Sequence, residues 1–229
     1  MFSYDGKTTR VIGKKNISIY RDLYEYLTAA IDSESLPSEF NYLGDSELAK
    51  NIYRKKYYLK DLNNKLIETR PEDVFKRVAA FMAVNEGTRG KQRKWADQFY
   101  TELFEGRFVP GGRVLAGSGD LFRLKTLANC FVAKIQEDDI DSIYKAAYEC
   151  ARTYSYGGGI GVDISCLRPR DAIVHNAADT SSGAVSFMEL YSLTTGLIGQ
   201  SGRRGALMLT IDIKHPDIHH FIRVKKIPN

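Results

Sequence analysis

Long apolar runs and paired cysteines are both missing from this 229-residue chain. No stretch approaches the roughly 20 apolar residues that a membrane helix needs, and residues 1–7 lack the apolar core of a signal peptide. We therefore expect a cytoplasmic protein with no membrane partner. The three cysteines, Cys130, Cys150 and Cys166, show no CxxC spacing, which argues against both a disulfide framework and a zinc site.

Concentrated charge is missing as well. The formal net charge is +5 and the pI is about 9.0, but Lys and Arg are spread along the chain and alternate with Asp and Glu. A generic RNA-binding protein would need clustered charge and exposed aromatic residues, so only a modest preference for anionic ligands is indicated. With 43% apolar and 27% charged residues, the composition is typical of a soluble globular protein with a buried core.

Residues 1–105 are expected to form a mainly helical region behind a polar arm at residues 1–16. Thr69–Glu72 has the pattern of a capping box with proline in the first turn, which predicts a helix running through Met82. A small hairpin is expected around Asn63–Asn64. Apolar residues recur at helical spacing in three further segments, at residues 17–32, 46–58 and 91–104.

From Gly106 onward, short apolar runs are punctuated by glycine, and the order of elements is typical of an α/β fold. The chain stops at Asn229 without a terminating signal, so we expect residues 106–229 to be part of a larger fold. The predicted strands and helices alternate: a buried strand at 129–134, a helix at 139–154, a strand at 160–164, a helix at 185–198, a strand at 206–213 and a last helix starting at His215.

Two glycine-rich, arginine-bearing loops follow the cysteine Cys130, at residues 157–170 and 199–205. Glycines let the backbone approach a ligand closely, and guanidinium groups pair with phosphate oxygens in a fork. Neither loop matches the dinucleotide-binding fingerprint or the P-loop. A nucleotide site beside a thiol is the functional interpretation, and exposed solvated loops are the alternative at about even odds for each loop alone.

Each candidate residue also has a purely structural interpretation. A single cysteine such as Cys130 is more often a small core residue, and a redox role needs a second thiol that spacing does not identify. The aspartates at 138, 139 and 141 open a helix, where capping ranks ahead of ligand binding. His215, His219 and His220 have no Glu or Cys nearby to complete a metal site, so we assign them to structure and expect no metal.

From about Gly106 to Lys225 the chain resembles the N-terminal half of the catalytic large subunit of ribonucleotide reductase, and residues 54–80 resemble its helical region more weakly. The resemblance rests on eight short blocks in the family's order: Arg107–Pro110, Asn129–Val132, Asp141–Ile143, Tyr156–Asp163, Leu167–Arg170, Ser182–Met188, Gln200–Ala206 and His215–Ile218.

The resemblance implies an α/β fold, in which a helical N-terminal region is followed by the first half of a ten-stranded α/β barrel. It also implies roles for individual residues. Cys130 would be one of two redox thiols, with its partner on the other half-barrel. Substrate would contact Asn129, Gly158, Gly159 and Arg204, whereas Asp138 and Arg168, with Asp139 and Ile140 nearby, would bind an effector. The specificity loop between the two sites would comprise Gln200, Ser201, Gly202, Arg203, Arg204 and Gly205.

The resemblance further implies partners and cofactors. Adenosylcobalamin, bound mainly by the second half, or a di-iron partner subunit would generate the radical. Thioredoxin or glutaredoxin would be the reductant, dNTP or ATP the effectors, and the assembly a dimer. Because the radical-bearing cysteine belongs to the second half, the chain alone is expected not to turn over. A split or interrupted gene, as in some phages, would explain the abrupt end, and a phage-encoded chain would act in the host cytoplasm.

Two departures from the family pattern stand out in the sequence. No recognisable ATP-cone is present at the N-terminus, and Pro110–Arg113 replaces a commoner phosphate-contacting motif with Pro-Gly-Gly-Arg. Backbone amides or Arg113 would then make the phosphate contact. A non-catalytic nucleotide-binding module derived from the same fold remains the alternative.

Overall fold

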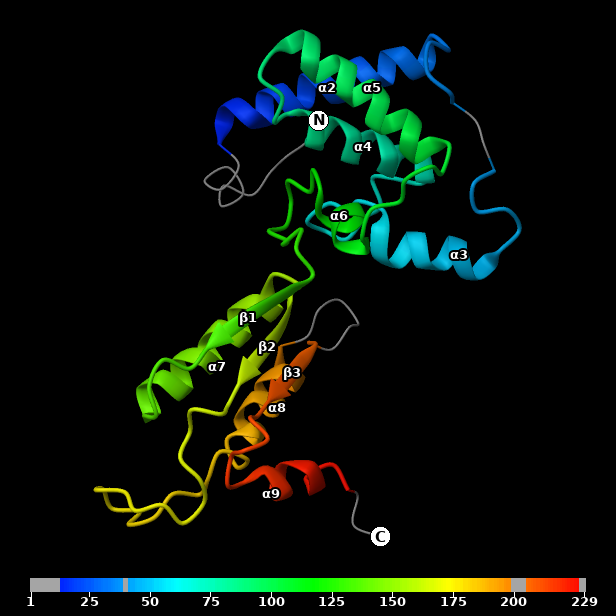
Figure 1. Cartoon of the computed structure of the whole chain (residues 1–229). Coiled ribbons are helices and arrows are strands. Elements are labelled where there is room, and N and C mark those ends of the chain that lie inside the picture. The colour runs from blue at the N-terminus through cyan, green and yellow to red at the C-terminus, as the bar shows by residue number, and fades with distance from the viewer. Residues whose placement is uncertain (1–12, 39–40, 199–204, 227–229) are drawn as a thin grey trace. The chain divides into compact units, whose positions relative to one another are not determined.

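The computed structural model describes residues 13–38, 41–198 and 205–226. They divide into two compact units, Met1–Leu127 and Ala128–Asn229, here called the helical unit and the sheet unit (Figure 1). The sequence predicts an earlier domain boundary, between residues 105 and 106, because the amino-acid composition changes at Gly106. Helix α6 nevertheless belongs to the helical unit, because it contacts α4.

Three long helices, α2, α4 and α5, contact one another and form the core of the helical unit. Tyr20, Leu27, Phe75, Val78 and Tyr100 are all buried there. The helices predicted from apolar spacing are therefore confirmed, although α2 begins three residues early and α6 was not predicted. The elements of this unit are α2 (Lys14–Asp32), α3 (Glu47–Ile52), the π-helix η1 (Tyr53–Tyr57), α4 (Pro71–Ala83), α5 (Arg89–Phe104) and α6 (Gly112–Gly117).

The start of α4 differs from the predicted capping box. The N-cap is Arg70, and the carboxylate that accepts hydrogen bonds from the Thr69 and Arg70 N–H groups, at 3.3 and 3.2 Å, belongs to Asp73. Pro71 occupies the first helical position, so the third helical residue is Asp73 rather than Glu72. Glu72 instead becomes a buried residue of the first turn.

The predicted helix at 46–58 changes geometry halfway along. It is α-helical to Ile52 and continues as one π-helical turn. The hairpin expected after it is reduced to a turn with a single antiparallel bridge between Lys60 and Leu66. Asn64 adopts the left-handed conformation there with φ 62°, which asparagine tolerates.

The sheet unit contains a three-stranded parallel sheet in the order β1-β2-β3. Helix α7 contacts β1 and β2, whereas α8 contacts β3 (Figure 1). This βαβ arrangement confirms the α/β class. The elements are β1 (Cys130–Lys134), α7 (Ile140–Ser155), β2 (Gly159–Asp163), α8 (Met188–Leu197), β3 (Leu207–Thr210) and α9 (Ile218–Arg223).

One face of this sheet is covered by helices and the other is open within the unit. Ala133, Ile160 and Val162 pack with Cys150 of α7 in one buried cluster. Side chains alternate along a strand, so Val132 points the opposite way, and it is 86% exposed. The prediction that β1 is buried is therefore wrong for this face, because no element of the described residues covers it.

Candidate functional site

The amino ends of the three strands meet at one edge of the sheet. Cys130 is paired with Gly159 in register, and the N–H of Gly159 donates to Asn129 O at 2.8 Å. On the other side, the Ile160 N–H donates to Ala206 O at 2.9 Å. The structure thus brings together Cys130, Asn129 and the glycine loop, which the sequence predicts as one site, and places Gly205 next to them.

Cys130 lies on the open face of the sheet. It alternates with Phe131 and Ala133, whose face packs on the helices, and it is an exposed free cysteine. Two neighbouring positions on β2, Gly159 and Gly161, carry no Cβ. At Gly161 an added Cβ would come no nearer than 3.9 Å to another group. A flat floor of backbone therefore lies beside the thiol.

The backbone amides of the glycine loop are already engaged within the chain. The N–H groups of Gly157, Gly158 and Gly159 donate to Tyr154 O, Thr153 O and Asn129 O, at 2.9, 2.9 and 2.8 Å. They are consequently not directed at a phosphate in the way the amides of an anion-binding nest are. The glycines allow close approach and tight packing rather than forming a cradle.

Packing alone accounts for glycine at 158. A Cβ there would lie 2.7 Å from Thr153 Cγ2 and 2.8 Å from Phe131 Cε2. At Gly205 the same atom would lie 3.0 Å from both Thr195 Cγ2 and Tyr154 Cδ1. Both glycines let their loops pass close to the end of α7.

The other two cysteines lie away from this edge. Cys150 is buried on α7, and its burial raises the pKa of the thiol to about 11. Cys166 follows β2 at the opposite edge, 3.9 Å from Ile135 O, and partial burial raises its pKa. The described residues therefore contain no disulfide.

At the carboxyl edge of the sheet, Arg168 and Asp138 bind each other. Arg168 Nε donates to Asp138 Oδ2 at 2.6 Å, and Nη2 donates to Asp138 O at 2.9 Å. Both residues follow strand ends, and a five-residue strand spans about 13 Å. The two predicted groups of residues, substrate and effector, are thus held at opposite ends of the same short sheet.

The neighbours of this pair have simpler roles. Asp139 is the N-cap of α7, and its carboxylate accepts the Ser142 N–H at 2.7 Å, which confirms the capping interpretation. Ile140, the first residue of α7, is 55% exposed. The buried residues of the helix begin at Ile143.

A hydrogen-bonded cluster that the sequence did not identify as part of a site holds the loop that carries Arg168. The Asp217 carboxylate accepts the N–H groups of Arg170 and Ala184, each at 3.2 Å. His215 Nδ1 accepts the Asp217 N–H at 3.0 Å, so Nε2 carries the proton and donates to Leu167 O at 2.7 Å. The block His215–Ile218 was the available signal, but it was interpreted as a helix start.

The remaining observations concern His215, the helices and the residues outside the described part of the chain. The buried His215 is structural, as predicted. The described residues contain no group of three potential metal ligands, and none of their helices is long and apolar enough to cross a membrane. Most of the predicted arm, residues 1–12, and Gln200–Arg204 of the specificity loop lie outside the described residues.

Two family models match most of the chain, from α3 to its end. Residues 43–122 match the ribonucleotide reductase all-alpha domain, and residues 128–229 match the ribonucleotide reductase barrel domain. The chain belongs to the ribonucleotide reductase large-subunit family. The resemblance in the sequence is thereby confirmed, and the helical unit followed by a parallel α/β unit is the family's order of domains.

Curated relatives agree with this assignment. The chain is 37% identical over 180 residues to a vitamin B12-dependent ribonucleoside-diphosphate reductase of Mycobacterium tuberculosis, a match that covers 77% of this chain and 25% of the relative. A Thermoplasma acidophilum protein of the same name is 40% identical over 123 residues, 53% of this chain and 16% of the relative. The ribonucleoside-diphosphate reductase subunit alpha of Helicobacter pylori is 31% identical over 203 residues, 88% of this chain and 24% of the relative. The chain spans about a quarter or less of the length of these relatives.

Proposed function

We propose that the chain forms part of the catalytic subunit of a ribonucleotide reductase that converts ribonucleoside diphosphates to deoxyribonucleoside diphosphates. The observation that carries the proposal is the position of Cys130: an exposed free thiol at the amino end of β1, on the open face of the sheet and beside Cβ-free Gly159 and Gly161. The relatives described above are all named as diphosphate reductases, which supports that substrate class.

The proposed chemistry uses Cys130 as one of two reducing thiols. A radical formed elsewhere abstracts the 3′ hydrogen of the ribose and later returns it. The C2′–O bond breaks, the oxygen leaves as water, and a C2′–H bond forms. Two thiols supply the two electrons and two protons and become one disulfide, so the ribose is reduced and the thiols are oxidised. The second thiol belongs to a part of the protein outside this chain.

Substrate binding is proposed at the amino edge of the sheet. Since the amides of the glycine loop are engaged within the chain, the contacts would come from the side chains of Asn129 and Arg204. The backbone floor at Gly159 and Gly161 would let the ribose approach the Cys130 thiol, because no Cβ stands between them.

The effector is proposed to bind at the carboxyl edge, about 13 Å away along the strands. Arg168 uses Nε and Nη2 to hold Asp138. Among the described residues, its Nη1 and Asp138 Oδ1 have no hydrogen bond of their own. A guanidinium N–H is suited to a phosphate oxygen, and a carboxylate oxygen is suited to a ribose hydroxyl. A dNTP or ATP could engage both atoms at once.

Further partners are proposed from the relatives' names and from the family. Adenosylcobalamin is the proposed source of the radical, because two of the relatives are named as vitamin B12-dependent, whereas no observation supports a di-iron subunit. A thiol, backbone and two Cβ-free positions fit a ribose rather than a corrin ring, so other segments of the whole protein would hold the cobalamin. Thioredoxin or glutaredoxin would reduce the disulfide. The protein would form a dimer, and effector binding would be coupled to it.

The test compares two exposed cysteines in the reductase assembled from this chain and the rest of the catalytic subunit. Formation of dCDP from CDP is measured with thioredoxin as the reductant. Cys130→Ser should abolish multiple turnover because a hydroxyl cannot form the disulfide, whereas Cys166→Ser at the opposite edge should retain it. Unchanged turnover by Cys130→Ser would refute the role. The alternative of a non-catalytic nucleotide-binding module would be favoured by nucleotide binding without any dCDP.

A further inference from the structure

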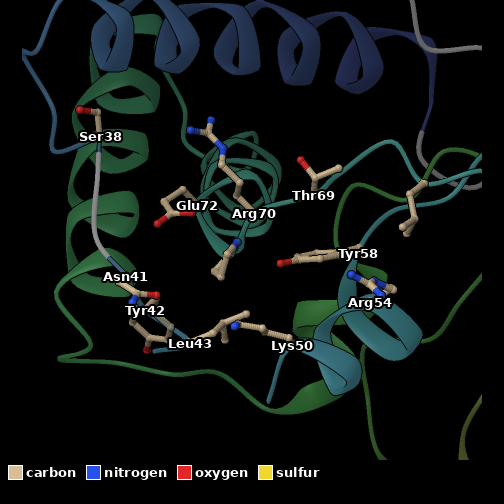
Figure 2. A pocket seen from close by; sticks show the side chains of 12 residues that line it. Ser38, Asn41, Tyr42, Leu43, Lys50, Arg54, Tyr58, Thr69, Arg70 and Glu72 are labelled. Atoms are coloured by element: carbon tan, nitrogen blue, oxygen red, sulfur yellow. The ribbon is translucent and has the colours of Figure 1, made fainter. Parts of the chain in front are cut away.

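A pocket in the helical unit has no place in the proposed reaction. Its volume is about 660 Å³, and it is lined by side chains from α3, from η1 and from the start of α4 (Figure 2). Volumes of about 300–1,000 Å³ are typical of small-molecule sites. Six of its residues carry the argument: Tyr42, Lys50, Arg54, Tyr58, Arg70 and Glu72.

Three of these side chains are cationic, and they differ in how far their charge is already compensated. Lys50 Nζ lies 3.2 Å from Glu47 Oε1, and Arg70 Nη2 lies 3.5 Å from Asp73 Oδ1. Arg54 forms no hydrogen bond or ion pair with any residue in the described part of the chain. It stands on the π-helical turn η1, a backbone geometry that is frequent at functional sites. The pocket therefore presents an uncompensated guanidinium.

The lining of the pocket also includes one buried carboxylate. Glu72 is only 7% exposed, and burial raises the pKa of its carboxyl. Within the described residues, no side chain donates a hydrogen bond to it. A backbone hydrogen bond from its own N–H partly offsets this rise in the pKa, and because a carboxylate has several acceptor sites, it can still accept hydrogen bonds from a ligand. Figure 2 shows the Tyr58 hydroxyl directed toward the same hollow, while Tyr42 is held by a ring contact of 5.1 Å with Phe75.

We propose that this pocket binds a nucleoside triphosphate, as a second nucleotide site separate from the substrate and effector sites. The phosphates would bind Arg54, with Lys50 as a second cation of the lining, because guanidinium and ammonium groups donate to phosphate oxygens. The base would place its ring N–H or amino donors on Glu72 and contact the Tyr58 ring. This site goes beyond the proposed reductase function, since every residue of it belongs to the helical unit.

The experiment is calorimetric titration of the full chain with ATP and, separately, with inorganic triphosphate. An Arg168→Ala background removes the proposed effector site, so that binding to the pocket is measured alone. In that background we expect one equivalent of ATP to bind. Arg54→Gln should weaken the affinity for ATP about tenfold, in line with the loss of one charge-assisted hydrogen bond. Lys94→Gln, an exposed cation on α5 outside the pocket, should bind as the background does.

Each remaining arm of the experiment decides one part of the proposal. Glu72→Gln should weaken the affinity for ATP but leave the affinity for inorganic triphosphate unchanged. Inorganic triphosphate should bind less tightly than ATP. Loss of all ATP binding in Arg168→Ala would overturn the second site while supporting the effector site. Equal affinities of Arg54→Gln and Lys94→Gln would overturn the pocket assignment. If the Arg168→Ala chain still bound two equivalents of ATP, only the assignment of the effector site would be contradicted.

Discussion

Arg77 is a fully buried charged residue of the helical unit. Its guanidinium binds Glu68, with Nε 2.6 Å from Oε1, and also donates to the carbonyl groups of Ser118, Tyr57 and Leu115. Glu68 in turn accepts the Leu59 N–H at 2.8 Å. One ion pair thus fixes the turn before α4, the π-helical turn and the end of α6 on each other.

We predict that Arg77→Met destabilises the helical unit by about 3–5 kcal/mol, because it leaves the Glu68 charge buried and unpaired. Adding Glu68→Gln should recover part of the loss, since the neutral amide still accepts from Leu59. Urea unfolding followed by the fluorescence of Trp95, the only tryptophan of the chain, measures this unit. Arg107→Met, which breaks an exposed pair with Glu102, is the control and should change little. An equal effect of both variants would contradict this account.

Thiol reactivity should follow burial. At pH 8 iodoacetamide should label Cys130 first, Cys166 more slowly and Cys150 only after unfolding. The raised pKa of Cys150, about 11 against an ordinary 9.0, favours the folded state as long as the thiol is neutral. That contribution is complete below pH 9 and is lost as the pH rises through 11. Mass spectrometry of labelled peptides measures the order, and early labelling of Cys150 would show that α7 is not packed as described.

At the scale of elements, the glycines of β2 and the loop before it are predicted to differ in what they tolerate. Gly158→Ala should destabilise the sheet unit by about 1–3 kcal/mol, because its Cβ would meet Thr153 and Phe131. Gly161→Ala should change stability by less than about 0.5 kcal/mol, because the site is open. Far-UV circular dichroism in urea detects the difference, while the Trp95 signal of the helical unit stays constant. Equal stabilities of the two variants would contradict the packing.

The loop that carries Arg168 should depend on Asp217. Asp217→Asn replaces a carboxylate that accepts backbone N–H groups with both oxygens by an amide with one acceptor, so a loss of about 1–3 kcal/mol is expected. Titration with dTTP should show weaker binding, since Arg168 is no longer positioned. Asp179→Asn is the matched control, because Asp179 is exposed at φ 60°, where asparagine is well tolerated. Equal dTTP affinities would remove Asp217 from the effector site.

Sequence periodicity sufficed for most elements, but local chemistry decided their ends. The apolar spacing of α2, α5 and α7 predicts each helix, since burial of one face is what the pattern records. Helix α6 was not predicted, because its six residues begin at Gly112, directly after Gly111, and consecutive glycines are typical of a loop. The π-helical turn at Tyr53 keeps a helical pattern of residues, so spacing alone does not reveal it.

The sequence proposes the members of the candidate site, but it does not predict how they lie relative to one another. The motifs around Cys130, Gly159 and Arg168 single out candidate residues, but the pairing of Arg168 with Asp138 joins positions 30 residues apart. Only the parallel register shows which motifs share an edge of the sheet. The engaged amides of the glycine loop were likewise hidden, because a glycine run allows both a ligand cradle and tight packing.

For the whole molecule, the central claim is that Cys130 at the amino edge of the sheet is oxidised as the ribose is reduced. The most direct measurement is the state of each cysteine after a single turnover of the assembled, pre-reduced reductase with CDP and no external reductant. Alkylation and mass spectrometry of the quenched enzyme should show Cys130 protected in a disulfide, in proportion to the dCDP formed, while Cys166 stays free. Formation of dCDP while the Cys130 thiol stays free, and is therefore fully alkylated after the quench, would contradict the account.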